Sequence, residues 1–198
     1  IDNNEAEAHA FYAQLRPQID ALPDWHPSLG VRREKMSGGE GATVWMLTSL
    51  YDLNEQWKLR GQFGTAFKMP NANDRWISDD TAVPEYVAAT ELVLQRQLAP
   101  HTRFTGSLYH YRRSDLPIEN ADGDEVPEGS SRARGVEAEI EHVWERGTRA
   151  RASVAWQRSR DVYERDAVNS PDLLGKLAFT FLLPGEALRA GFEAQYLG

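Results

Sequence analysis

The stretch Arg134-Gly-Val-Glu-Ala-Glu-Ile-Glu-His-Val-Trp144 indicates the fold class of this chain most clearly. In an extended conformation one face carries Val136, Ala138, Ile140 and Trp144, and the other carries Glu137, Glu139 and Glu141. A helix would scatter these carboxylates around its circumference, whereas a strand of period two separates them from the apolar side chains. The stretch therefore predicts a β-strand with one apolar and one charged face.

The same alternation continues on the C-terminal side. Apolar Ala150, Ala152, Val154 and Trp156 alternate with Arg149, Arg151, Ser153 and Gln157. The intervening residues 145–148 contain Gly147, which suits a tight turn because glycine accepts a positive φ. Residues 188–196 and 57–63 repeat the pattern, so the two faces are a property of the chain and not of one strand.

Extending this pattern predicts an all-β chain of about ten antiparallel strands. The expected strands are residues 8–18, 28–35, 42–52, 55–67, 85–98, 101–112, 132–145, 148–160, 172–183 and 187–198. The segments 42–52 and 85–98 alternate less cleanly than the others. The chain begins at Ile1 and ends at Gly198 within an alternating segment, so we expect a partial barrel in which the first and last strands are unpaired edges.

The connections between the expected strands alternate in length. Short ones are expected near 21–24, 52–55, 99–101, 145–148 and 184–186, and long ones near 35–41, 68–84, 113–131 and 161–170. Outer-membrane barrels have short periplasmic turns and longer extracellular loops, and carry aromatic girdles at both interfaces. Trp57, Trp144 and Phe181 should point outward beside short turns, and Trp156, Phe63 and Tyr196 near the opposite ends.

Composition is compatible with this interpretation and excludes several classes of protein. The net charge is -8, which argues against general nucleic-acid binding. Cysteine is absent, which removes thiol catalysis, disulfides and cysteine-ligated metals. No apolar run is long enough for a transmembrane helix. The mean hydropathy of -0.58 does not separate a soluble protein from a membrane barrel, whose apolar residues occupy every second position.

Five pieces of the sequence resemble the TonB-dependent receptor family of outer-membrane proteins. They are Leu59–Asn71 with its Phe-Lys-Met-Pro-Asn end, Glu91–Leu94, Leu108–Leu116, Ser131–Glu139 with its Gly-Val-Glu, and Asn169–Pro171 followed by Lys176. Their order and spacing match over roughly residues 10 to 198. Val93 and Lys68 depart from the residues usual in the family, which are Gly and Arg.

The resemblance implies that residues 1–198 are part of a larger barrel of about 22 strands. It also implies uptake of a scarce nutrient, often a ferric siderophore, driven by an inner-membrane complex through TonB. The plug domain and TonB box of the family are expected to lie outside this chain. Outer-membrane lipid, the nutrient and TonB are thus the expected partners, the expected location is the bacterial outer membrane, and neither a cofactor nor an enzymatic activity is expected.

Two sets of residues are candidates for function. The lumen-facing candidates are Arg60, Gln62, Glu137, Glu139, Arg149, Arg151, Glu193 and Gln195, although lumen walls are polar in any case. The candidates for ligand contact are Arg75, Trp76, Arg112 and Arg113, because arginine and aromatic side chains suit an anionic siderophore and loops usually carry recognition. The loops near 68–84 and 113–131 should lie at one end of the barrel.

Motifs for other chemistry are weak. The five histidines lack metal-binding spacing, and the acidic residues 120–125 lack the spacing of a calcium loop, so no metal site is expected. No nucleophile elbow surrounds a serine, and the glycines of 37–41 lack the Lys-Ser/Thr of a phosphate-binding loop. Two alternatives to an uptake receptor stay open: a passive or structural outer-membrane barrel such as a porin or adhesin, and a soluble β-sandwich binding module.

Overall fold

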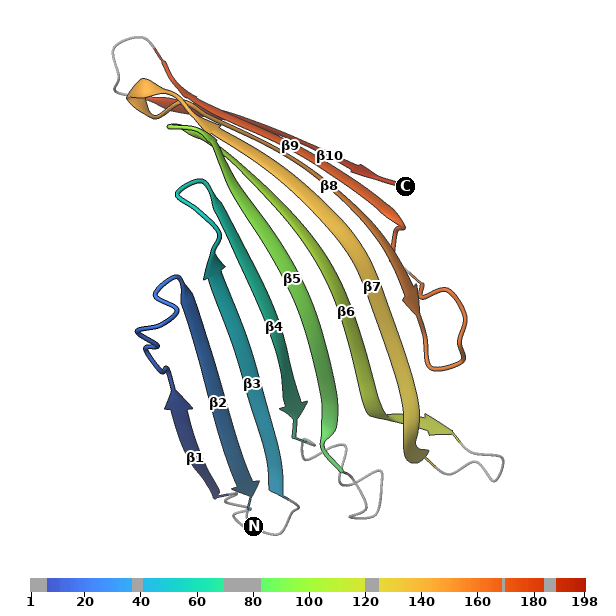
Figure 1. Ribbon diagram of the computed structural model, residues 1–198. Coiled ribbons are helices and arrows are strands. Elements are labelled where there is room, and N and C mark those ends of the chain that lie inside the picture. The colour runs from blue at the N-terminus through green and yellow to red at the C-terminus, as the bar shows by residue number, and fades with distance from the viewer. Residues whose placement is uncertain (1–6, 37–40, 70–82, 120–124, 169, 184–187) are drawn as a thin grey trace.

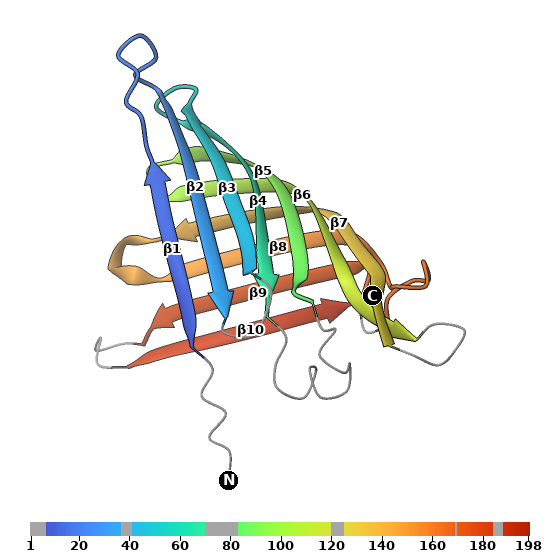
Figure 2. The same ribbon diagram turned by 90° about the horizontal axis from the view of Figure 1, so that it is seen from below.

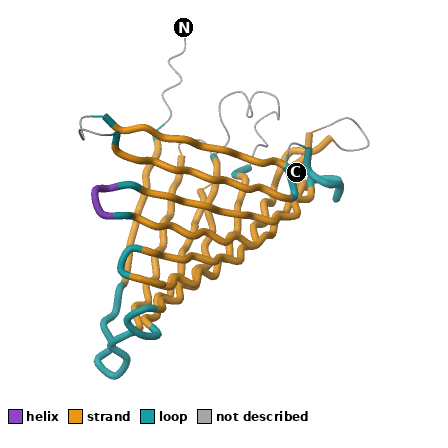
Figure 3. Tube along the Cα trace, turned by 90° about the horizontal axis from the view of Figure 1, so that it is seen from above, coloured by secondary structure: helices purple, strands orange, loops and turns teal. Residues whose placement is uncertain are grey.

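The computed structural model describes residues 7–36, 41–69, 83–119, 125–168, 170–183 and 188–198. Within these residues the secondary structure is almost entirely β-strand, with one short 3-10 turn, η1, at Glu145–Gly147 (Figure 3). The strands are β1 (Ala8–Leu15), β2 (Trp25–Met36), β3 (Gly41–Asp52), β4 (Trp57–Lys68), β5 (Glu85–Ala99), β6 (Thr102–Glu119), β7 (Glu125–Val143), β8 (Arg149–Arg160), β9 (Leu173–Leu182) and β10 (Arg189–Leu197). None of the described segments is a helix long and apolar enough to cross a membrane.

All ten strands belong to one curved sheet in which the spatial order follows the sequence order (Figures 1 and 2). Each strand pairs antiparallel with the next, as in an up-and-down meander. The sheet does not close, because β1 and β10 each pair with a single neighbour. The prediction of a partial antiparallel barrel is thus confirmed. The alternative of a β-sandwich is wrong, since a sandwich requires a second sheet.

The register carries the alternation of side chains from strand to strand. Val136 lies between Leu108 of β6 and Trp156 of β8, so the row is apolar across three strands. Glu137, one residue on, lies between Ser107 and Ala155 on the other face. Among the described residues, the only buried apolar side chains are those of Ala42, Pro84, Val93 and Leu116. The sheet therefore has no core of its own and exposes its apolar face, as expected of a barrel wall whose outer solvent is lipid.

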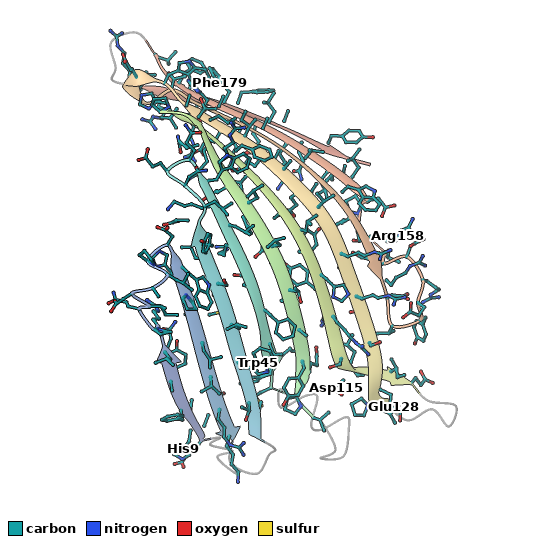
Figure 4. The ribbon with its side chains drawn as sticks, viewed as in Figure 1. His9, Trp45, Asp115, Glu128, Arg158 and Phe179 are labelled. Atoms are coloured by element: carbon teal, nitrogen blue, oxygen red, sulfur yellow. The ribbon has the colours of Figure 1, made fainter. Side chains whose placement is uncertain are left out.

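Aromatic side chains gather near both ends of this apolar face, as predicted. At the end with the shorter turns, Trp144 packs against Phe179 at 6.2 Å between ring centroids, and Phe179 lies 5.5 Å from Phe181. At the other end, the rings of Trp45 and Phe63 are 4.7 Å apart. Figure 4 shows Phe179 and Trp45 near opposite ends of the sheet. Rings with an apolar body favour such interfacial positions.

The prediction of a long loop over residues 113–131 is wrong. β6 continues to Glu119 and β7 begins at Glu125, so most of this segment is a hydrogen-bonded hairpin. Its pairing shifts register after Arg113 and again after Leu116, and Asp115 has a φ of 59°. Such bulges interrupt the alternation and admit proline, which the sequence pattern had marked as loop.

The strict alternation of long and short connections is also wrong. At the short-turn end, β1 and β2 are separated by residues 16–24, a longer connection than residues 37–40 and 120–124 at the opposite end. The reason is that β2, β6 and β7 extend further than predicted, while β1 stops at Leu15. The ends of β4 and β6 do lie at one end of the sheet, as predicted, because both strands run in the same direction in the meander.

Candidate functional site

The polar face of the curved sheet lines an open hollow of about 640 Å³ that extends from β4 to β10. Five residues proposed from the sequence as lumen-facing line it: Arg60, Glu137, Glu139, Arg151 and Glu193. They come from four strands, and the register brings them together because each occupies an inward position of the alternation. We call this surface the concave wall.

Charged groups on the concave wall are paired across neighbouring strands. Glu91 of β5 accepts a hydrogen bond from the Gln62 amide at 2.6 Å and lies 3.7 Å from the Arg60 guanidinium. On β8, the Arg151 guanidinium lies 3.9 Å from the Glu139 carboxylate. All of these groups are partly exposed, so each pair contributes little to stability, about 0–1 kcal/mol. What the pairs do is fix the direction of donors and acceptors on the wall.

Two sequence candidates lie away from the centre of the hollow. The Arg149 guanidinium pairs with the Glu141 carboxylate, and the Arg103 guanidinium lies 3.3 Å from the same carboxylate. These three side chains form a cluster near the short-turn end. Gln195 of β10 is the cross-strand partner of Lys176 of β9, and it lies two residues from Glu193, on the same face of β10. Both therefore belong to the polar face of the sheet.

Of the two candidates for ligand contact among the described residues, the structure places one on the polar face. Arg113 lies on the polar face at the mouth, where its guanidinium is 3.1 Å from Glu85, and Lys68 binds the same carboxylate at 2.8 Å. Arg112 stands opposite Arg132 on the other face, so its strand position turns it away from the hollow. Arg75 and Trp76 lie outside the described residues, as do most of the acidic segment at 120–125 and the glycine-rich segment at 37–41.

Several residues of the concave wall were not singled out from the sequence. Glu91, Gln157 and Lys176 line the hollow, and the Tyr109 hydroxyl donates a hydrogen bond to the Gln157 side chain at 3.0 Å. Gln157 in turn donates to the backbone carbonyl of Pro171 at 3.0 Å. The signal that could have found them is the alternation itself, continued from Glu137 onto the strands that pair with it.

Asp161 ties the connection between β8 and β9 into a turn outside the apolar band. Its carboxylate accepts hydrogen bonds from the backbone amides of Tyr163 and Arg165, both at 2.9 Å, and pairs with the Arg165 guanidinium at 3.1 Å. Desolvation is the largest single influence and raises the pKa of Asp161, but these bonds together outweigh it and hold the pKa below its usual value.

We expect this turn to keep its full stability above the usual aspartate pKa of about 3.9 and to lose it as the pH falls through the lower folded-state pKa. An NMR titration of the Asp161 carboxyl in refolded protein measures the midpoint, with a peptide of residues 158–168 as the unfolded reference. A folded-state midpoint equal to or above that of the peptide would contradict the prediction. Asp161→Asn should remove the pH dependence of the turn.

A one-sheet meander with an apolar outer face, interfacial aromatics and a polar concave wall is a segment of a membrane-spanning β-barrel. The family model described as TonB dependent receptor-like, beta-barrel, matches residues 1–198. The chain therefore belongs to this family, whose members are proteins of the bacterial outer membrane. A search of curated proteins found no match.

Solved structures with the same fold include three receptors or transporters. The ferripyoverdine receptor of Pseudomonas aeruginosa superposes with a TM-score of 0.76 at 16% identity, covering 98% of this chain and 28% of that one. The FrpB iron transporter from Neisseria meningitidis gives 0.73 at 15% identity, with 97% and 33% covered. The alcaligin receptor FauA from Bordetella pertussis gives 0.71 at 18% identity, with 97% and 38% covered. The chain thus spans about a third of the length of these structures.

Proposed function

We propose that this chain is the wall of a receptor that imports a scarce nutrient of the ferric siderophore type, with energy delivered through TonB to a plug domain elsewhere in the parent protein. The observation that carries the proposal is the polar concave wall, with its fixed donors and acceptors, in a chain that belongs to the TonB-dependent family throughout. Ferripyoverdine and alcaligin receptors among its structural neighbours support the class of ligand.

Recognition is proposed to begin at the end of the sheet where β4 and β6 finish. There, Lys68 and Arg113 converge on Glu85 at the base of the connection from β4 to β5. The connection itself contains the arginine and tryptophan at positions 75 and 76, which suit an anionic, partly aromatic iron complex. The described ends of β4 and β5, Lys68 and Glu85, therefore mark this end of the sheet as the place where recognition is proposed to begin.

The test is uptake by the full-length receptor, expressed as the sole TonB-dependent receptor of a host strain. We expect replacement of residues 70–82 by a short Gly-Ser linker to reduce surface binding of radioactive ferric siderophores at least about tenfold, on the scale of lost charge-assisted hydrogen bonds. Deletion of TonB should leave surface binding intact and abolish accumulation. A matched control inserts the same linker in the turn at residues 53–56, at the opposite end.

Three outcomes would count against the proposal. Accumulation that continues without TonB would indicate a passive barrel. Binding that survives the 70–82 replacement in a correctly assembled receptor would remove this connection from the recognition surface. Failure to bind any member of a panel of catecholate, hydroxamate and mixed ferric siderophores would overturn the ligand class.

A further inference from the structure

A cluster of six basic side chains lies on the apolar, outward face of the sheet, away from the concave wall. It comprises His110 and Arg112 of β6, Arg132 and Arg134 of β7, and Arg158 and Arg160 of β8. The register places His110, Arg134 and Arg158 side by side in one row, and Arg112, Arg132 and Arg160 in the next. Side chains directly opposite one another on neighbouring strands are about 5 Å apart. We call these residues the basic patch.

The basic patch begins where the apolar band ends. The preceding row on the same face is Leu108, Val136 and Trp156, which are 55%, 41% and 48% exposed. The first basic row follows two residues, or about 7 Å, further along the strands. Arg158 thus lies two residues beyond Trp156, near the end of β8 that leads into the connection at residues 161–172 (Figure 4).

The end of the sheet that carries the patch is assigned to the cell exterior. The two longest connections, residues 69–84 and 161–172, are both at this end, which also has residues 37–40 and 120–124, whereas the other end has residues 16–24, 53–56, 100–101, 144–148 and 183–188. Outer-membrane barrels keep their short turns in the periplasm and their longer loops outside. The basic patch therefore stands at the depth of the headgroups of the outer leaflet.

The positive charge of the patch is only partly compensated by the protein. Arg132 pairs with Glu164, and Arg160 lies 3.5 Å from Asp166 and also donates to the Glu164 backbone carbonyl. Within the described part of the chain, no acidic partner is found for Arg112, Arg134 or Arg158. Like charges placed directly opposite across strands destabilise a sheet. The three adjacent strands β6, β7 and β8 nevertheless place basic side chains directly opposite one another, which points to an anionic ligand from outside the chain.

We propose that the basic patch binds the phosphate groups of lipopolysaccharide, the phosphorylated glycolipid of the outer leaflet. Guanidinium groups bind phosphate oxygens through two parallel hydrogen bonds. The two rows place five arginines on the same face of three adjacent strands. Acyl chains of the same lipid would lie along Leu108, Val136 and Trp156. A ligand in the hollow does not reach the patch, because the sheet separates the two faces. The proposal rests on the fold and orientation and does not depend on which nutrient is imported.

The experiment measures lipid binding by the full-length receptor in detergent, by native mass spectrometry and by titration with purified lipid. The probes are diphosphorylated lipid A, its dephosphorylated form, phosphatidylglycerol and inorganic phosphate. The patch variant is Arg134→Gln with Arg158→Gln. The matched control removes two arginines from the other face and end, Arg103→Gln with Arg149→Gln. Heat-modifiable migration on gels confirms that each variant is folded.

We expect diphosphorylated lipid A to bind at least about tenfold more tightly than the dephosphorylated form, and the patch variant to lose at least about tenfold per guanidinium. The control variant should bind as the unaltered receptor does. If the patch variant does not fold, Arg134→Lys with Arg158→Lys keeps the charge and should show a smaller loss because lysine lacks the planar fork.

Several results would overturn the proposal. Equal affinity for the phosphorylated and dephosphorylated lipid would show that acyl chains alone are bound. Equal affinity for phosphatidylglycerol would show a response to surface charge in general. Inorganic phosphate binding as tightly as lipid A would make the ligand a free anion. An equal loss in the control variant would assign the effect to net charge and not to the patch.

Discussion

Replacing Ile140 by arginine is expected to destabilise the folded barrel by about 2–4 kcal/mol, the cost of a cation at the midplane of an outer-membrane barrel. Ile140 is 44% exposed in this sheet and lies in an apolar row between Phe104 and Ala152. It is four residues from Val136, at the edge of the basic patch, and four from Trp144, at the short-turn end. The side chain thus faces the middle of the hydrocarbon.

The measurement is a urea titration of the full-length receptor refolded into lipid vesicles, followed by tryptophan fluorescence. Ile140→Leu is the size-matched control and should change the free energy of unfolding by less than about 1.5 kcal/mol. Ser153→Arg introduces the same charge on the polar face, where Ser153 stands opposite Glu139. Equal losses for Ile140→Arg and Ser153→Arg would show that the two faces have been assigned incorrectly.

The faces of the strands could be predicted from the sequence because they depend only on alternation. Val136 and Glu137 differ in polarity, and a strand of period two places them on opposite sides whatever its partners are. The order of strands followed from the same pattern, since consecutive strands joined by short connections pair with each other. These two features were enough to predict a barrel wall with an apolar outside.

The ends of the strands could not be predicted in the same way. Pro117, Pro127 and Gly129 break the alternation between residues 113 and 131, and in an isolated sequence they indicate a loop. In the folded chain, bulges absorb the irregularity, and pairing resumes between Leu116 and Gly129 and between Ile118 and Val126. Pairing of this kind depends on the partner strand and not on either segment alone.

The contacts between side chains of the candidate site could not be predicted from the sequence either. Alternation put Arg60 and Glu137 on one face, but the pairing of Arg60 with Glu91 depends on how β4 and β5 slide against each other. The prediction for Arg112 and Arg113 gave both residues the same role. The sequence predicts ligand contact for both, at the end of the expected strand 101–112 and the start of the expected loop 113–131, whereas adjacent residues of one strand must face opposite sides.

Placing a side chain at Gly135 is expected to destabilise the sheet by about 1–3 kcal/mol, the usual cost of overpacking. A Cβ atom there would lie 2.5 Å from the Tyr109 hydroxyl oxygen and 2.7 Å from the backbone carbonyl of Trp156. Tyr109 is the direct cross-strand partner of Gly135, so its ring occupies the space that the glycine leaves open. Covering a glycine with an aromatic ring from the next strand is a known means of stabilising such a position.

Gly135→Ala should therefore displace Tyr109 and break its hydrogen bond to Gln157 on the concave wall. The free energy of unfolding and the resonances of the Tyr109 ring report the two effects separately. Gly61→Ala is the matched control, because a Cβ at Gly61 meets only the Leu92 side chain, at 3.9 Å. Combining Tyr109→Ala with Gly135→Ala should recover the part of the lost free energy of unfolding that comes from the clash with the Tyr109 ring. The part that comes from the Trp156 backbone carbonyl should remain, because a smaller residue at position 109 does not move that carbonyl. If Gly135→Ala costs no more than Gly61→Ala, the ring of Tyr109 does not lie over Gly135, and the link between this glycine and the concave wall is removed.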